Sequence, residues 1–263
     1  MKIAIVSNPK IKNVEPVISE ITESLSNAGL ESDILKLDNL QDCYDFVLAI
    51  GGDGTILKSS RFYSKRAIPV MGINLGRLGF LSLITKEEIS NLGDIIKNKK
   101  YIIEERTMLK SGKYTALNDF VVKGHSNIRT SKFNMYINDK LISEYIADGI
   151  IISTPTGSTA YGLSAGGPII HPGLESMVIV PICAHTMTAR PLVVPVTEKV
   201  RIKSVDESLD LSSDGQEKIT EVKEVTIEQC EHKAKLAFPP SDDNFYSVLQ
   251  SKLLWGISPV SEG

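Results

Sequence analysis

The sequence is poor in cysteine. Its 263 residues include three cysteines, which are odd in number and far apart: Cys43, Cys183 and Cys230. This pattern fits neither a disulfide framework nor a CxxC metal pair. The four histidines do not form an HExxH motif, which argues against a zinc site. We therefore expect a protein of a reducing compartment that holds no zinc.

Long hydrophobic runs and an excess of one charge are also missing. No apolar stretch approaches the roughly 20 residues that cross a bilayer, and the run from Met1 to Val6 is too short for the apolar core of a signal sequence. Lys and Arg number 29 against 32 Asp and Glu, a net charge of -3. This balance gives no general attraction to nucleic acid or to an anionic membrane. The sequence thus predicts a cytoplasmic protein that binds neither nucleic acid nor a membrane.

The remaining composition is that of a folded protein. Hydrophobic residues make up 42% and charged residues 23% of the chain, which is close to the globular average. The length suits one large domain or two of ordinary size.

The first hundred residues alternate β-branched runs with amphipathic stretches. Strands are predicted at 3–7, 33–37, 46–50 and 70–73, and helices at 14–28, 56–63 and 86–97. Gly29 stands where a helix C-cap is expected. Such alternation is typical of βαβ units on a parallel sheet. We expect an α/β domain over residues 1–104.

After about Ile102 the pattern changes to short strands separated by polar turns. They are predicted at 114–122, 133–137, 141–146, 150–153, 178–182, 200–205, 222–227 and 234–238. Many strands without intervening helices favour an antiparallel sandwich. We expect this β-rich domain to cover residues 105–240. The segment 241–263, with a helix at 244–255, is expected to pack back onto the first domain.

The sharpest motif is Gly51-Gly52-Asp53-Gly54-Thr55, between a predicted strand and a predicted helix. Glycines there let successive backbone N–H groups bind an anion at a helix N-terminus, which suits a phosphate. The motif is neither a Walker A sequence nor a GxGxxG fingerprint. A carboxylate within it suits a kinase, in which Asp53 binds a cation or takes the proton of an attacking hydroxyl. The alternative is a tight turn in which Asp53 is only a cap.

A second stretch, residues 154–168, is crowded with hydroxyl groups and glycines and contains the ring of Tyr161. This combination suits a nucleoside. The alternative is a polar turn that caps a short helix. Asp148 precedes three isoleucines, and an acid at the mouth of a buried strand needs a partner or ligand.

Two shorter motifs are weaker. Asn118-Asp119 interrupts the apolar run 114–122, and adjacent strand residues point to opposite faces, so at least one faces a ligand or a hydrogen-bonded core site. Asp214-Gly215-Gln216 reads foremost as a hairpin turn.

These motifs occur in the order seen in the NAD kinases, which the chain resembles. The order is 51–55, Gly72 to Leu81, Asn118-Asp119, Asp148-Gly149, Thr154 to Tyr161 and Asp214-Gly215-Gln216, and the likeness runs from Ile3 to about Trp255. The resemblance implies a Rossmann-like α/β N-terminal domain and a β-rich C-terminal domain that forms the NAD site.

The resemblance also implies the reaction, which is transfer of the γ-phosphoryl of ATP, or of polyphosphate or another donor, to the 2′-hydroxyl of the adenosine ribose of NAD. The product is NADP. It implies a divalent metal, Mg²⁺, whose protein ligands are not identified by the motifs. It further implies a homodimer or homotetramer with the site completed across subunits.

The resemblance assigns roles to particular residues. Asp53 is the implied general base. Asn118 and Asp119 match a ribose-holding pair in which many members carry Glu at the second position, and Asp148 matches an acid on the nicotinamide side. The other implied substrate-binding residues are Gly52, Gly54, Thr55, Lys58, Thr156, Thr159, Ala160, Tyr161, Ser164, Ala184 and Gln216.

Two alternatives differ in class. Diacylglycerol- and sphingosine-type lipid kinases share the GGDGT loop, but they continue with a Gly-Thr-Gly-Asn-Asp segment, whereas Pro69 here leads into the segment from Gly72 to Leu81. The sequence also lacks a basic amphipathic membrane helix. The second alternative is a catalytically silent NAD(P)-binding sensor, against which the presence of Asp53 argues.

Overall fold

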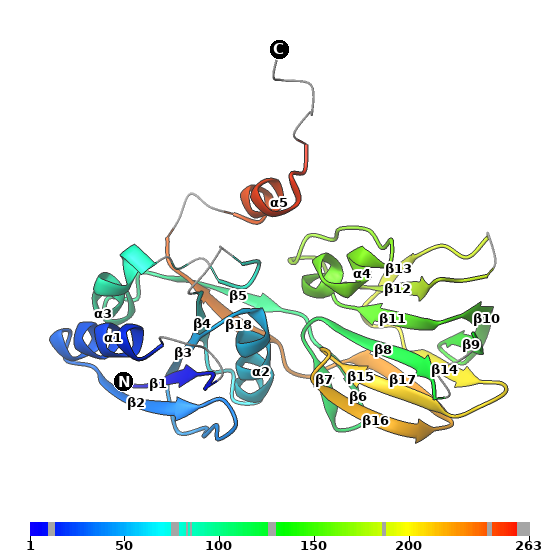
Figure 1. Ribbon diagram of the computed structural model, residues 1–263, viewed down its shortest axis with the longest axis horizontal. Coiled ribbons are helices and arrows are strands. Elements are labelled where there is room, and N and C mark those ends of the chain that lie inside the picture. The colour runs from blue at the N-terminus through cyan, green and yellow to red at the C-terminus, as the bar shows by residue number, and fades with distance from the viewer. Residues whose placement is uncertain are drawn as a thin grey trace, which may run out of the picture. The chain divides into compact units, whose positions relative to one another are not determined.

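The computed structural model describes residues 1–9, 14–74, 79–82, 84, 86–125, 130–185, 188–240 and 244–256. The chain divides into two compact units (Figure 1). Unit 1 comprises Met1–Glu104 and Lys235–Gly263, and unit 2 comprises Glu105–Ala234. In the described part of the chain, none of the helices combines the length and the apolar character that crossing a bilayer requires.

Unit 1 is built on a six-stranded sheet in the order β2-β1-β3-β4-β18-β5. Its strands are β1 (Lys2–Ser7), β2 (Glu31–Lys36), β3 (Phe46–Ile50), β4 (Val70–Ile73), β5 (Ile102–Arg106) and β18 (Ala234–Phe238). β1 pairs in parallel with β2 and β3, and β4 pairs in parallel with β3 and β18. The predicted α/β fold is confirmed, and these pairings are the parallel ones that the alternating pattern predicts, within a sheet that is mixed as a whole.

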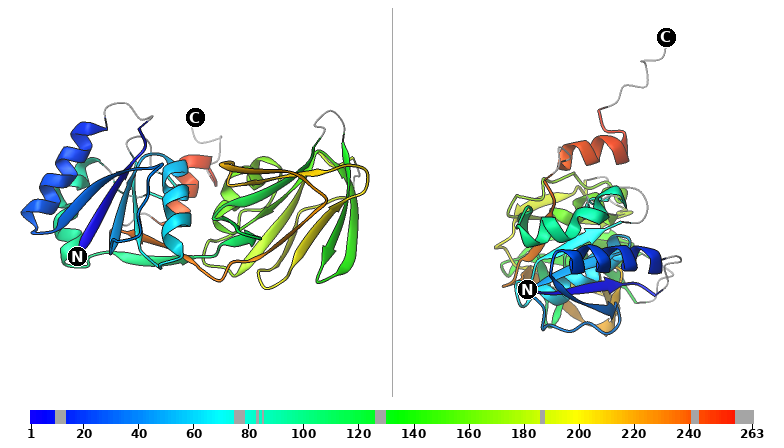
Figure 2. Two further views of the ribbon diagram at one scale, coloured as in Figure 1. Left: turned by 90° about the horizontal axis from the view of Figure 1, so that it is seen from below. Right: turned by 90° about the vertical axis from the view of Figure 1, so that its left-hand side faces the viewer.

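Helices cover both faces of this sheet. The chain crosses from β1 to β2 in one direction and from β3 to β4 in the other, so right-handed crossovers place their helices on opposite faces. α1 (Glu15–Asn27) accordingly lies on one face and α2 (Asp53–Ser64) on the other (Figure 2). α1 buries Val17, Ile21 and Leu25 against the apolar strands.

The segment predicted as one helix over 86–97 is two elements. A 3-10 helix η1 (Lys86–Asn91) is followed by α3 (Leu92–Lys97). Gly93 lets α3 approach α1 closely, because a Cβ atom at this position would lie 2.1 Å from the carbonyl oxygen of Ser24. Its N–H instead donates to the Ser24 hydroxyl at 3.0 Å.

The C-terminal part of the chain contributes to unit 1. α5 (Phe245–Leu253) begins with a capping box formed by Asn244 and Ser247, and the Phe245 ring lies 6.3 Å from the Phe80 ring. The β-rich domain was expected to extend to residue 240, but the units divide after Ala234. The reason is that β18 pairs with β4, with Leu236 opposite Val70, and thereby completes the sheet of unit 1.

Unit 2 is a sandwich of two six-stranded sheets, in the orders β10-β9-β14-β17-β6-β7 and β13-β12-β11-β8-β15-β16. The strands are β6 (Leu109–Ser111), β7 (Tyr114–Ala116), β8 (Asp119–Gly124), β9 (Ser131–Ile137), β10 (Lys140–Ala147), β11 (Gly149–Ser153), β12 (Ser176–Ile182), β13 (Leu192–Pro195), β14 (Val200–Ser204), β15 (Leu209–Ser213), β16 (Glu217–Val222) and β17 (Glu224–Gln229). These strands pair in antiparallel fashion, including β8 with β11 and β15. The predicted β-sandwich is confirmed.

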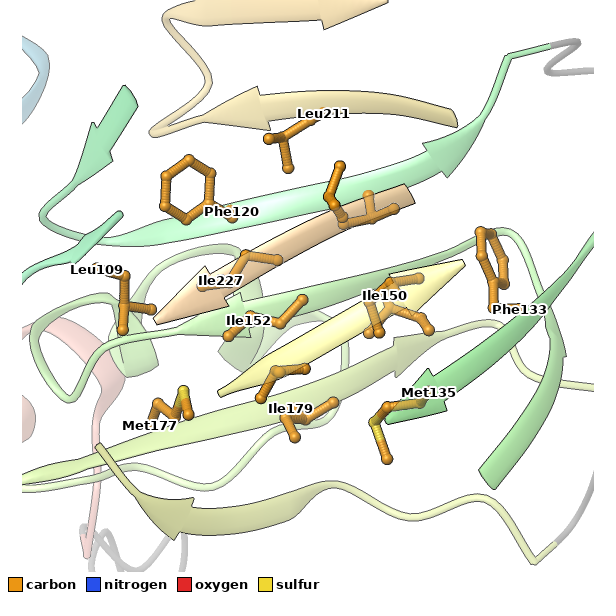
Figure 3. Packing of buried hydrophobic residues seen from close by; sticks show 14 of the residues in the cluster. Leu109, Phe120, Phe133, Met135, Ile150, Ile152, Met177, Ile179, Leu211 and Ile227 are labelled. Atoms are coloured by element: carbon orange, nitrogen blue, oxygen red, sulfur yellow. The ribbon is translucent and has the colours of Figure 1, made fainter. Parts of the chain in front are cut away.

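The core of unit 2 lies between the two sheets (Figure 3). Ile150 and Ile152 of β11 point into it, opposite Met135 of β9 and Ile227 of β17. The intervening Ile151 faces the other side of its sheet, where it packs against Ile170 and neighbouring valines. The strand β11 is therefore buried on both faces, which explains its run of three isoleucines.

Candidate active site

The glycine-rich loop of unit 1 connects β3 to α2. The Gly51 N–H donates to the carbonyl oxygen of Ile73 at 2.9 Å, which ties the loop to the end of β4. Gly52 is the N-cap residue, and Asp53 is the first residue of α2. Asp53 does not occupy the capping position, so the interpretation of this residue as a simple cap is not supported by the structure.

The Asp53 carboxyl is held at the edge of the protein interior. Its Oδ1 atom is buried and has no hydrogen-bond partner among the described residues. Burial raises the pKa of this carboxyl, and the positive charge of Lys252 on α5 partly opposes the rise. A carboxylate with a raised pKa and an unused acceptor atom is suited to receive a proton.

Other residues of the motif are placed differently. Thr55 is buried in α2. The Lys58 ammonium forms an ion pair with Asp38 at 2.7 Å, so the structure does not bring it to Asp53. The motif from Gly72 to Leu81 is described in part, because residues 75–78 lie outside the described residues.

In unit 2 the expected strand over 114–122 is interrupted. β7 ends at Ala116 and β8 begins at Asp119. The carbonyl oxygen of Leu117 accepts a hydrogen bond from Thr154 Oγ1 at 2.6 Å, and that of Asn118 accepts one from the Thr154 N–H at 2.8 Å. These two residues therefore leave the strand because their carbonyl groups bond to the hydroxyl-rich loop.

Asp214 satisfies the N–H groups of the same segment. Its Oδ2 accepts from Leu117 N at 3.0 Å, and its Oδ1 accepts from Asn118 N at 2.8 Å and Asp119 N at 3.1 Å. Asp214 and Gly215 have φ of 49° and 64°, as the predicted hairpin turn requires. This turn is thus also the anchor of Asn118-Asp119, a role that the Asp-Gly pattern does not reveal.

The hydroxyl-rich loop packs directly against this anchor. It forms a 3-10 helix η2 (Thr156–Thr159) and α4 (Tyr161–Ser164), which lies against β11 (Figure 1). A Cβ atom on Gly157 would lie 2.1 Å from the carbonyl oxygen of Asn118. Glycine at this position is what lets the loop approach so closely.

A pocket of about 560 Å³ opens where these segments meet. Of the predicted site residues, Asn118, Asp119, Ala160 and Tyr161 line it. Asp214, which the sequence marked foremost as a turn residue, also lines it, and sequence reasoning missed the other polar lining residues, which are Lys123, Asp210, Ser212 and Lys218. Lys123 of β8 and Asp210 and Ser212 of β15 alternate along their strands with core residues, and none of the three belongs to a recognisable sequence motif.

The electrostatics of the pocket centre on Asp119. This side chain is 5% exposed. Two causes raise the pKa of Asp119 to about 7: burial, which is the larger, and the negative charge of Asp214. Asp210, which also lines the pocket, pairs with Lys218 at 2.8 Å and with His125 at 2.9 Å.

Both units match a known family. The C-terminal domain of ATP-NAD kinases matches residues 117–238, and the N-terminal domain of the same enzymes matches residues 31–101. The chain belongs to the ATP-NAD kinase family. The predicted resemblance is confirmed, and membership favours this family over the lipid kinases.

Full-length relatives agree with this ATP-NAD kinase assignment. The chain is 38% identical over 253 residues to the NAD kinase of Legionella pneumophila (strain Corby), covering 90% of this chain and 85% of the relative. It is 37% identical over 260 residues to the NAD kinase of Aquifex aeolicus, with 93% of each chain covered.

Solved structures of this family share the fold. An NAD kinase from Archaeoglobus fulgidus in complex with ATP has a TM-score of 0.81 and 26% identity, over 95% of this chain and 97% of that one. Yeast NADH kinase complexed with NADH has a TM-score of 0.84, covering 98% and 89% respectively; at 22% identity it shows a common fold.

The other residues of unit 2 that were predicted to bind substrate do not line the pocket. Asp148 is exposed in the turn before β11, so water satisfies its carboxylate and the buried partner expected for it is not needed. Thr156 is buried, and Thr159 Oγ1 donates to its carbonyl oxygen at 3.4 Å. Ser164, at the end of α4, and Gln216 are exposed, and Ala184 is half-buried.

Proposed function

We propose that the chain is an NAD kinase that transfers the terminal phosphoryl group of ATP, or of another donor such as polyphosphate, to the 2′-hydroxyl of the adenosine ribose of NAD. The observation that carries the proposal is Asp53, a carboxyl with a raised pKa and an unpaired buried oxygen at the start of α2. It lies in a chain that matches both domains of the family.

The bonds that form and break in this reaction belong to the two substrates and not to the protein. The oxygen of the 2′-hydroxyl attacks the terminal phosphorus, the bond from that phosphorus to the bridging oxygen breaks, and ADP leaves with the bonding electrons. The proton of the hydroxyl passes to the Asp53 carboxylate. Backbone N–H groups at the start of α2 suit the negative charge of the phosphates, and Gly52, Gly54 and Thr55 are assigned to that cradle.

Unit 2 supplies groups for the acceptor. Asn118 and Asp119 have amide and carboxyl groups at the pocket wall that suit ribose hydroxyls. The Tyr161 ring, which is 40% exposed, offers a stacking face for a base. We assign Asp148, Thr156, Thr159, Ala160, Ser164, Ala184 and Gln216 to further acceptor contacts, and Lys58 to a looser one.

A divalent ion, Mg²⁺, belongs to the proposal. The described residues hold no group of three or more His, Cys, Asp or Glu side chains placed to bind a metal. This fits Mg²⁺, which keeps several waters and is held largely through substrate phosphates. The ion would come with the donor and neutralise the charge of its phosphates.

The assembly and the cellular location are part of the same proposal. We assign the protein to the cytoplasm and to a homodimer or homotetramer whose site is completed by a second copy. The support for both is membership of the family, and the balanced charge of the chain, -3 in total, agrees with the first.

The test is a coupled assay with purified protein, NAD, ATP and Mg²⁺, in which an NADP-specific dehydrogenase detects the product. Reactions that omit the metal or the donor, or replace ATP with polyphosphate, serve as controls. We expect steady NADP formation that requires NAD, a donor and the metal. Binding of NAD without NADP formation from either donor would instead identify a silent sensor.

A further inference from the structure

The acceptor pocket is longer than the two residues assigned to the ribose require. Asp119, Val121 and Lys123 of β8 all line it, at alternate positions along one face of the strand. At about 3.3 Å per residue, the Asp119 and Lys123 backbones lie about 13 Å apart. The pocket volume of about 560 Å³ is that of a small-molecule site. A ligand held at Asn118 and Asp119 therefore has room to extend along β8 toward Lys123.

Two lysines line the part of the pocket that has no assigned ligand group. They are Lys123 on β8 and Lys218 on β16, and Asp210 of β15 connects them. Asp210 lies opposite Lys123 in the antiparallel pairing of β8 and β15, where Cβ atoms of opposed residues are about 5 Å apart. The Asp210 carboxylate also forms an ion pair with the Lys218 ammonium at 2.8 Å. The two lysines thus lie on either side of one buried carboxylate.

The two ammonium groups differ in how far the protein neutralises them. The Asp210 side chain, which is 7% exposed, pairs with Lys218 and His125. Lys123 forms no ion pair within the part of the chain that the structure describes, although Asp210 lies opposite it. Its stem lies close to β11, because a Cβ atom on Gly149 would be 3.0 Å from Lys123 Cγ. A half-buried lysine in a pocket, with its charge not neutralised by the protein, suits a phosphate group.

We propose that Lys123 and Lys218 form a phosphate-binding subsite of the acceptor pocket, and that this subsite holds the pyrophosphate that joins the two nucleosides of the dinucleotide. Lys123 supplies an unneutralised charge, and Lys218 supplies N–H donors that Asp210 keeps in place. Without the lysines the charged lining would consist of Asp119, Asp210 and Asp214, which would repel the phosphates. The inference rests on the proposed function, which puts a dinucleotide in this pocket.

The first test is the NAD affinity of Lys123→Gln, measured by isothermal titration calorimetry without a donor. Loss of one charge-assisted hydrogen bond should raise the Kd for NAD about ten-fold. Lys123→Arg keeps the charge and should restore most of the affinity. Lys203→Gln is the matched control, since Lys203 is an exposed lysine of β14, in the other sheet of unit 2. It should bind NAD as the wild type does.

Adenosine distinguishes phosphate binding from general damage to the pocket. Adenosine has the base and the ribose but no phosphate, so its affinity, measured by competition with NAD, should be the same in Lys123→Gln and in the wild type. Added salt should weaken NAD binding by the wild type more than by Lys123→Gln, because it screens the contact that the variant lacks. Lys218→Gln should lower NAD affinity by less than Lys123→Gln does, because Asp210 already neutralises Lys218.

Three results would overturn the subsite. They are equal NAD affinity of Lys123→Gln and the wild type, equal losses of NAD and adenosine affinity in Lys123→Gln, and the same loss of NAD affinity in Lys203→Gln. NADP formation by the wild type is measured on the same preparation. Its absence, with NAD still bound, defeats the proposed function and leaves the binding results to decide the subsite. A wild-type protein that binds no NAD would overturn both.

Discussion

Asp214 accepts a hydrogen bond from the backbone N–H of Asp119 at 3.1 Å, and its negative charge raises the pKa of the Asp119 side chain. One carboxylate thus positions the backbone of the other residue and also alters its ionisation. The arrangement gives unit 2 a carboxyl group with a pKa of about 7 beside the pocket assigned to the acceptor.

The raised pKa predicts a pH-dependent stability. Asp119 binds its proton more tightly in the folded state than in the unfolded state, where the pKa of an aspartate side chain is 3.8. Its favourable contribution is complete below about pH 4 and is lost as the pH rises toward 7 and beyond. The difference in unfolding free energy between wild type and Asp119→Asn should therefore shift by about 2 kcal/mol between pH 5 and pH 8, to the disadvantage of the wild type.

Urea unfolding of both proteins at the two pH values measures this difference. Groups that do not interact with Asp119 cancel in the comparison. A difference that is the same at pH 5 and pH 8 would show that Asp119 ionises in the folded protein as it does in the unfolded chain.

Replacement of Asp214 by Asn should weaken both the fold and the acceptor site. The variant presents an amide NH₂ group to one of the three N–H groups that the carboxylate now accepts. We expect a loss of about 1–3 kcal/mol in unfolding free energy and a several-fold rise in the KM for NAD. Asp139→Asn is the control, because Asp139 also has a positive φ in a hairpin turn but is 92% exposed.

Denaturation and steady-state kinetics check this prediction. Asp139→Asn should stay within about 0.5 kcal/mol of the wild type. Equal stability of the two variants would mean that Asp214 is only a turn residue.

Two glycines of the hydroxyl-rich loop should respond differently to alanine. A methyl group on Gly157 would collide with the Asn118 backbone at 2.1 Å, whereas the nearest atom to one on Gly162 is Ser153 Cβ at 3.8 Å. Gly157→Ala should therefore displace Asn118 and abolish detectable NAD binding, and Gly162→Ala should bind NAD as the wild type does. Isothermal titration calorimetry measures NAD binding by both variants. Normal NAD binding by Gly157→Ala would show that the hydroxyl-rich loop is not part of the acceptor site.

Part of the architecture was predictable because some signals are local. The strands at 46–50 and 70–73 occur where they were expected, since buried strands of a parallel sheet read as continuous apolar runs. The glycines of the 51–55 loop and the change in pattern near Ile102 are also local features.

Other features depend on residues distant in sequence. The break between β7 and β8 is held by Asp214, about a hundred positions along the chain, and by Thr154. β18 reads as one more strand of the β-rich region, yet it joins unit 1 because its partner β4 lies there.

The most direct test of the account is the turnover of Asp53→Asn, with NAD binding measured on the same preparation and Asp139→Asn as an exposed control. The account predicts that Asp53→Asn lowers kcat for NADP formation by about 10²–10⁴, the range for general acid–base groups. NAD affinity should be retained and Asp139→Asn should behave as the wild type. A near-normal kcat in Asp53→Asn would show that this carboxylate is not the base.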